Sequence, residues 1–155
     1  AVISDLNIAM LTVHVIGGMK MLKEAINAVQ GTKIKLIGVT VLTSMDYEDL
    51  IECGVTRETK SQVVLLAKLA KKSGLHGVVC SVLECQEVRK ECGKDFYIVT
   101  PGIRMGFNND DQKRIATPKE ALDSSADYIV IGRPITGSKD PAESVRLITD
   151  KINKN

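Results

Sequence analysis

Short apolar runs alternate with amphipathic stretches along most of the chain. The apolar runs are rich in β-branched residues, which is typical of strands covered on both faces. Between them, apolar residues recur at helical spacing, as at Leu22, Ile26 and Val29. The pattern predicts five strands, at Met10–Ile16, Lys35–Leu42, Gly77–Ser81, Phe96–Thr100 and Tyr128–Ile131. It also predicts helices over 18–29, 46–53, 59–72 and 83–92, and two more that open at the capping residues Thr117 and Asp140.

The alternation of strands and helices predicts an α/β fold built on a parallel sheet. Both a doubly wound sheet and a (β/α)8 TIM barrel have strands at this spacing. Polar and glycine residues follow every predicted strand and no G-x-G-x-x-G fingerprint follows the first, so we favour the barrel. A complete barrel takes about 200 residues or more, whereas this chain has 155 residues and does not begin with Met. We therefore expect an incomplete barrel that is part of something larger.

Composition excludes several classes of protein. The chain is 44% hydrophobic and 26% charged, with a net charge of +2, which is typical of a soluble globular protein rather than a disordered one. No apolar run reaches the roughly 20 residues of a membrane helix, and no secretory leader opens the chain. Lys and Arg are scattered and Trp is absent, so we expect neither a nucleic-acid partner nor a membrane partner.

The cysteines and histidines do not have the spacing of a metal site. Cys53, Cys80, Cys85 and Cys92 form no C-x-x-C pair, and the two histidines lie far apart. We interpret the cysteines as reduced and structural, with the cytoplasm as the default compartment and no metal. His14 lies inside an apolar strand, where a core residue is a better interpretation than a catalytic base.

Two segments after predicted strands are candidates for ligand binding. Gly132 and Arg133 follow the last strand, and the loops after the last barrel strands commonly bind phosphate, which Arg matches with a bidentate fork. The alternative is a solvated surface arginine. Pro101–Arg104 begins a long polar loop, in which Arg104 points either at a ligand or at solvent. The alternative for this loop is a flexible insertion.

Other residues give only weaker indications of a binding or catalytic role. Thr43 and Ser44 end the second strand and offer hydroxyls to a polar ligand, although such residues also open helices. No catalytic triad, metal cluster or pair of carboxylates at strand ends stands out. The segment Asp111–Lys113 places a carboxylate near an ammonium, but a solvated segment is the better interpretation because other charges surround it.

Six segments, taken together and in order, closely resemble bacterial orotidine 5′-phosphate decarboxylase. They are Val13–Gly18, Thr40–Met45, Gly77–Ser81, Val99–Arg104, Asp111–Pro118 and Ile131–Thr136. The resemblance covers nearly the whole chain and implies that residues 1–155 are the C-terminal part of a single (β/α)8 barrel domain, with strands 4–8 and their helices. Strands 1–3 would precede Ala1.

The resemblance also implies roles for individual residues. Substrate-binding positions would be Thr43, Ser44, Arg104, Gln112, Gly132 and Arg133. Thr43 and Ser44 would contact the nucleotide, with Ser44 facing the pyrimidine. Arg104 and Gln112 would close over the ligand, Gln112 bridging base and phosphate, while Gly132 and Arg133 would grip the phosphate. The family uses no metal or organic cofactor; phosphate binding helps to stabilise a vinyl carbanion as carbon dioxide leaves.

One departure from the family is large. The family's catalytic Asp-x-Lys-x-x-Asp motif, which lies at the end of strand three and is completed by an aspartate of the partner subunit, is absent from this sequence. We therefore expect no catalytic residue in this chain and no decarboxylation by the chain alone. Its outer strands, Met10–Ile16 and Tyr128–Ile131, would have open edges. We expect them to need the missing strands or a second copy.

Three functions remain open at this point. The leading one is decarboxylation of orotidine monophosphate to uridine monophosphate by a cytoplasmic homodimer, with this chain supplying the phosphate- and base-binding half. The second is a sugar-phosphate decarboxylase of the same suprafamily, and the third is a non-catalytic protein that binds a nucleotide monophosphate.

Overall fold

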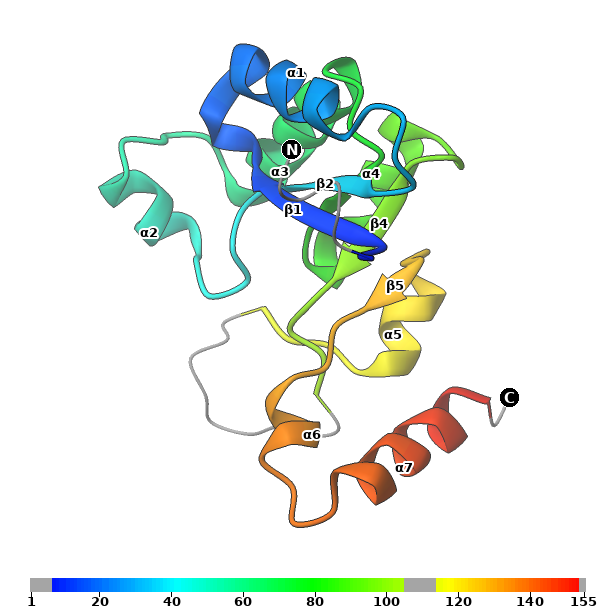
Figure 1. Ribbon diagram of the computed structural model, residues 1–155. Coiled ribbons are helices and arrows are strands. Elements are labelled where there is room, and N and C mark those ends of the chain that lie inside the picture. Colours follow the sequence, from blue (N-terminus) through cyan, green and yellow to red (C-terminus); the bar gives the residue numbers. More distant parts are fainter. Residues whose placement is uncertain (1–6, 105–113, 154–155) are drawn as a thin grey trace.

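The computed structural model describes residues 7–104 and 114–153 as a single parallel sheet with helices (Figure 1). The five strands are hydrogen-bonded in chain order, β1–β2–β3–β4–β5, and every neighbouring pair is parallel. They are β1 (Met10–His14), β2 (Lys35–Val39), β3 (Gly77–Val79), β4 (Tyr97–Thr100) and β5 (Tyr128–Ile129). All five predicted strands are confirmed, and consecutive strands lie side by side, as they do in a barrel.

Four of the five strands end two or three residues earlier than predicted, whereas β4 ends at Thr100 as predicted. Val15–Gly17 forms a 3-10 turn, η2, instead of continuing β1. Beyond the paired residues, single hydrogen bonds persist, such as the one from the Thr40 N–H to the Val79 carbonyl at 3.2 Å. The hydrogen-bonded ladder ends after these residues because the backbone that follows each strand turns away toward the next helix. The apolar runs therefore extend past the strands into the turns.

Helices follow the strands at the predicted places, and one further short helix, which was not predicted, follows β5. They are α1 (Gly18–Val29), α2 (Tyr47–Glu52), α3 (Thr59–Lys72), α4 (Cys85–Cys92), α5 (Pro118–Asp123), α6 (Arg133–Thr136) and α7 (Pro141–Asn153). Thr117 forms a capping box, and the Glu143 N–H donates to the Asp140 carboxylate at 2.9 Å, so these two predicted caps are confirmed. Asp46 forms a further capping box at the start of α2. The predicted 83–92 helix is divided into a 3-10 turn, η3 (Val82–Glu84), and α4, since Ser81 caps the turn first.

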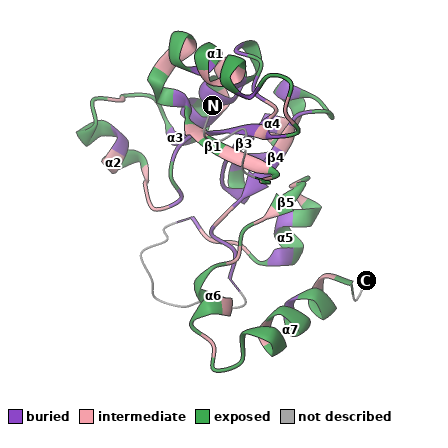
Figure 2. Ribbon diagram, viewed as in Figure 1, coloured by how far each residue is buried: buried purple, intermediate pink, exposed green. Residues whose placement is uncertain are grey.

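The core lies between the sheet and α1, α3 and α4. Leu22, Val63, Val88, Val78 and Ile98 are all fully buried in it (Figure 2). They come from three helices and two strands, so one face of the sheet is covered by helices. A smaller cluster consists of Val82, Ile103 and Ala121, of which Ala121 belongs to α5.

The opposite face of the sheet is partly open. Large apolar side chains that follow the two outermost strands are exposed: Ile16 by 69% after β1 and Val130 by 49% after β5. His14 is also exposed, so its interpretation as a core residue is wrong. It lies at the end of an edge strand, where the alternation of the strand points it away from the helices, like Thr12.

Within the described ranges, none of the helices is long and apolar enough to span a membrane.

Candidate functional site

The candidate residues gather at the carboxyl edge of the sheet. Thr43 follows β2, Arg104 follows β4, and Gly132 and Arg133 follow β5 (Figure 1). All strands of a parallel sheet end at the same edge, so residues far apart in sequence meet there. This is the arrangement predicted for a barrel mouth.

The backbone fixes both ends of the long loop after β4. The Arg104 N–H donates to the Ala116 carbonyl at 2.8 Å, and the Ala116 N–H donates to the Gly102 carbonyl at 3.2 Å. Gly102 has a φ of +75°, and a Cβ there would lie 2.8 Å from the Arg114 carbonyl oxygen. Only glycine allows this close approach without strain. The two ends of the loop are therefore held side by side.

Thr43 is buried against this loop base. Its carbonyl accepts a hydrogen bond from the Arg114 N–H at 3.2 Å, and its side chain lies 3.7 Å from the position of a Cβ on Gly102. Ser44 is half-buried beside it. The structure thus brings the predicted Thr43 and Pro101–Arg104 segments together, although they are about sixty residues apart in sequence.

Arg104 does not point into solvent. Its side chain is only 7% exposed, and one guanidinium nitrogen, Nη1, donates to the Ile103 carbonyl at 2.9 Å. The solvent-facing alternative for this residue is therefore wrong. Gln112 and the Asp111–Lys113 segment lie outside the described residues, so the predicted role of Gln112 stays a prediction.

Gly132 and Arg133 have a different environment. Arg133 is exposed and opens the short α6, and a Cβ on Gly132 would meet no atom within 4 Å. Space beside a backbone glycine and an exposed guanidinium suit an anionic oxygen. Their assignment to a phosphate stays a prediction.

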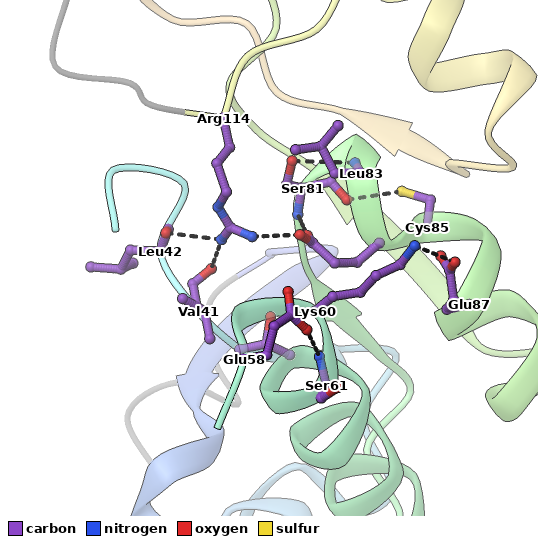
Figure 3. A network of polar contacts seen from close by, with 12 residues as sticks. Val41, Leu42, Glu58, Lys60, Ser61, Ser81, Leu83, Cys85, Glu87 and Arg114 are labelled. Carbon is purple, nitrogen blue, oxygen red and sulfur yellow. Dashed lines mark hydrogen bonds and ion pairs between the residues drawn. The ribbon is translucent and has the colours of Figure 1, made fainter. Parts of the chain in front are cut away.

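Sequence reasoning missed one feature of this edge, a buried ion pair between Arg114 and Glu84. Arg114 Nη1 lies 2.6 Å from Glu84 Oε1, and the two side chains are 8% and 3% exposed (Figure 3). Burial raises the pKa of the Glu84 carboxyl, although Arg114 and the Ser81 N–H act in the opposite direction. A capping-box pattern at Ser81–Glu84 is visible in the sequence, but no local pattern connects it to Arg114.

The cysteines have two kinds of environment. Cys80, Cys85 and Cys92 are buried and unpaired, and Cys85 Sγ lies 3.3 Å from Thr100 Oγ1. These three behave as small core residues, as predicted. Cys53 is exposed, so it is not a core residue. In the ranges 7–104 and 114–153, no three His, Cys, Asp or Glu side chains are grouped so that they could hold a metal ion.

Comparison with known proteins gives one consistent result. A model of the orotidine 5′-phosphate decarboxylase / HUMPS family matches residues 1–148. Over 97% of its length, the chain is 73% identical to an orotidine 5′-phosphate decarboxylase of Wolbachia pipientis subsp. Culex pipiens (strain wPip), of which it covers 66%. The decarboxylase of Ehrlichia canis (strain Jake) is 54% identical over 99% of this chain and is covered to 67%.

Comparison with solved structures leads to the same family. The crystal structure of orotidine 5′-phosphate decarboxylase from Lactobacillus acidophilus superposes with a TM-score of 0.81 at 38% identity, over 97% of this chain and 66% of that one. The chain therefore spans about two thirds of the length of these relatives, and the predicted incomplete barrel is confirmed. On the family match and these identities, the chain belongs to the orotidine 5′-phosphate decarboxylase / HUMPS family.

Proposed function

We propose that this chain supplies the phosphate- and base-binding part of a decarboxylase that converts orotidine monophosphate to uridine monophosphate. One observation carries the proposal: 73% identity, over 97% of the chain, to a protein named orotidine 5′-phosphate decarboxylase. The barrel portion is proposed to be the C-terminal part of one domain, strands 4–8. The proposal extends to a cytoplasmic homodimer, as the family resemblance implies.

The geometry supports separate binding of the nucleoside and the phosphate by different residues along the carboxyl edge of the sheet. Thr43 and Ser44 lie after β2 and would contact the nucleoside, and Arg104, which follows β4, would close over the ligand. Arg133, exposed after β5, would pair with the phosphate through its guanidinium. Phosphate bound away from the reacting carbon can supply binding energy that is used in the transition state.

The proton-transfer residues are proposed to come from elsewhere in the enzyme. The sequence contains no Asp-x-Lys-x-x-Asp motif, and a carbanion formed by loss of carbon dioxide needs a positioned acid to protonate it. We propose that residues 1–155 alone bind nucleotide weakly and decarboxylate nothing. Joined to the three further strands proposed for the barrel, they would take part in the full reaction.

Two assays test the proposal. The full-length protein should decarboxylate orotidine monophosphate, followed by the change in ultraviolet absorbance, and should bind uridine monophosphate by calorimetry. Arg133→Ala should weaken that binding at least roughly 100-fold, since a charge-assisted bidentate contact is lost. The matched control Arg146→Ala removes an exposed arginine of α7 that pairs with Glu143, and should leave the affinity unchanged.

Other outcomes would identify the alternatives. Tight binding of uridine monophosphate without turnover would favour a non-catalytic nucleotide-binding protein. Turnover of a sugar phosphate in place of orotidine monophosphate would favour the related sugar-phosphate decarboxylases. Unchanged binding in Arg133→Ala would show that the phosphate assignment is wrong.

A further inference from the structure

The buried ion pair of Arg114 and Glu84 lies directly beneath the candidate nucleoside side of the site. Arg114 is the first described residue after the loop that follows β4, and Glu84 belongs to η3, which follows β3. Their side chains meet at 2.6 Å with almost no exposure to solvent. An ion pair this deeply buried costs desolvation free energy, and apolar residues of similar size are often as stable or more so. Stability alone is therefore a poor explanation for it.

Arg114 also holds three consecutive carbonyls after β2. Its Nη2 donates to Val41 O at 3.1 Å and to Leu42 O at 3.0 Å (Figure 3). Its backbone N–H donates to Thr43 O at 3.2 Å. The segment that presents Thr43 is thus bound to one side chain and one backbone group of the same residue. Hydrogen bonds from a charged donor hold geometry more strongly than neutral ones.

Glu84 fixes the orientation of the guanidinium. While Oε1 binds Arg114, Oε2 accepts a hydrogen bond from the Ser81 N–H at 3.1 Å. Both carboxylate oxygens are therefore held by groups from different segments. Arg114 Nε is buried and has no hydrogen-bond partner among the described residues, so the guanidinium is held by its two terminal nitrogens.

These contacts do not extend to the phosphate side. Within the described residues, the hydrogen-bond partners of Arg114 belong to the segment after β2 and to Glu84, and none belongs to the region around Gly132 and Arg133. A change at Arg114 should therefore shift the Val41–Thr43 backbone and leave Arg133 in place.

We propose that Arg114, oriented by Glu84, is a positioning residue that fixes the Val41–Thr43 backbone and thereby sets the affinity for the pyrimidine nucleoside, separately from the phosphate. This inference rests on the proposed function. Arg114 itself does not contact the substrate in this proposal.

The test compares two ligands that share a phosphate. Uridine monophosphate carries the pyrimidine and ribose 5-phosphate lacks it, so their affinities separate the two sides of the site. Calorimetry would be done on the full-length protein with Arg114→Met and with the double variant Arg114→Met/Glu84→Gln. The double variant leaves no uncompensated buried charge and keeps an acceptor for the Ser81 N–H, so it guards against failure to fold. Arg146→Met is the matched control.

We expect the double variant to bind uridine monophosphate roughly 10-fold more weakly and ribose 5-phosphate within about 2-fold of the unmodified protein, because only the nucleoside side is displaced. An equal loss for both ligands would show a merely structural role and overturn the inference, as would no loss for either. If the unmodified protein neither binds uridine monophosphate nor decarboxylates, the proposed function fails instead.

Discussion

The two sides of the candidate nucleotide site lie on regions that are packed very differently. The nucleoside side belongs to the layer formed by β1–β4 with α1, α3 and α4, which shares one large buried core. The phosphate side belongs to β5, α6 and α7, where α6 buries no residue and α7 buries only Ile148. Figure 2 shows this contrast, with α7 almost entirely exposed.

The open edges do not explain this difference, since β1 and β5 are both outermost strands of the sheet. The helix after β1, α1, buries Leu22 and Val29 in the large core, whereas the helices after β5 bury only Ile148. The nucleoside side is therefore organised by a core within this chain, and the region of β5, α6 and α7 has little core of its own.

The largest effect should come from removing core volume in the well-packed region. Leu22→Ala in α1 deletes a side chain that is fully buried, and we expect a loss of about 3 kcal/mol in the free energy of unfolding. Leu147→Ala in α7 is the matched control, because Leu147 is 52% exposed, and should cost less than about 0.5 kcal/mol. Urea denaturation of both variants measures the difference. Equal losses would contradict the contrast between the regions.

An intermediate effect should come from the side chain that joins the two regions. Arg89 of α4 donates to the Phe96 and Ser125 carbonyls at 2.8 and 3.0 Å and pairs with Asp127 at 2.7 Å, just before β5. Arg89→Met should cost about 2 kcal/mol and loosen β5. Hydrogen exchange at the Val130 N–H, which donates to Thr100 O, would report the loosening.

Arg146→Met, at an arginine side chain that is 70% exposed, should change stability by only a few tenths of a kcal/mol. If exchange at Val130 stays unchanged in Arg89→Met, then Arg89 does not hold β5 against the rest of the sheet.

Local features of the sequence were sufficient for much of the fold. The strands, α3 and the caps at Thr117 and Asp140 could be predicted because apolar spacing and capping residues act within a few positions. The meeting of Thr43 with Gly102 could be anticipated at the level of the sheet edge, since parallel strands end together. Predicting that these two residues lie at the same edge required no knowledge of side-chain packing.

Features that depend on distant partners could not be predicted. Glu84 and Arg114 are thirty positions apart, and each reads locally as an ordinary charged residue. His14 was misplaced because an apolar strand pattern does not say which face is covered by helices. The excess length of the strands has the same origin, since apolar residues such as Ile16 and Leu42 continue past the ladder onto the exposed side.

The smallest effect should be a pH dependence that is confined to the well-packed region. His76 Nδ1 accepts a hydrogen bond from the Leu36 N–H at 3.0 Å, which joins the starts of β2 and β3. Burial, and then the charge of Lys35, lower the pKa of His76. The unfolded chain therefore binds more protons than the folded one near pH 6, so stability should rise with pH and be lost as pH falls below the ordinary histidine value of about 6.5.

His76→Asn keeps an acceptor in this position but cannot be protonated. We expect its unfolding free energy to vary less between pH 5 and 7 than that of the unmodified protein, by up to about 1 kcal/mol. Urea denaturation at several pH values measures the slope of stability against pH for both proteins. An equal slope in His76→Asn and in the unmodified protein would show that the proton-sensitive group is not His76.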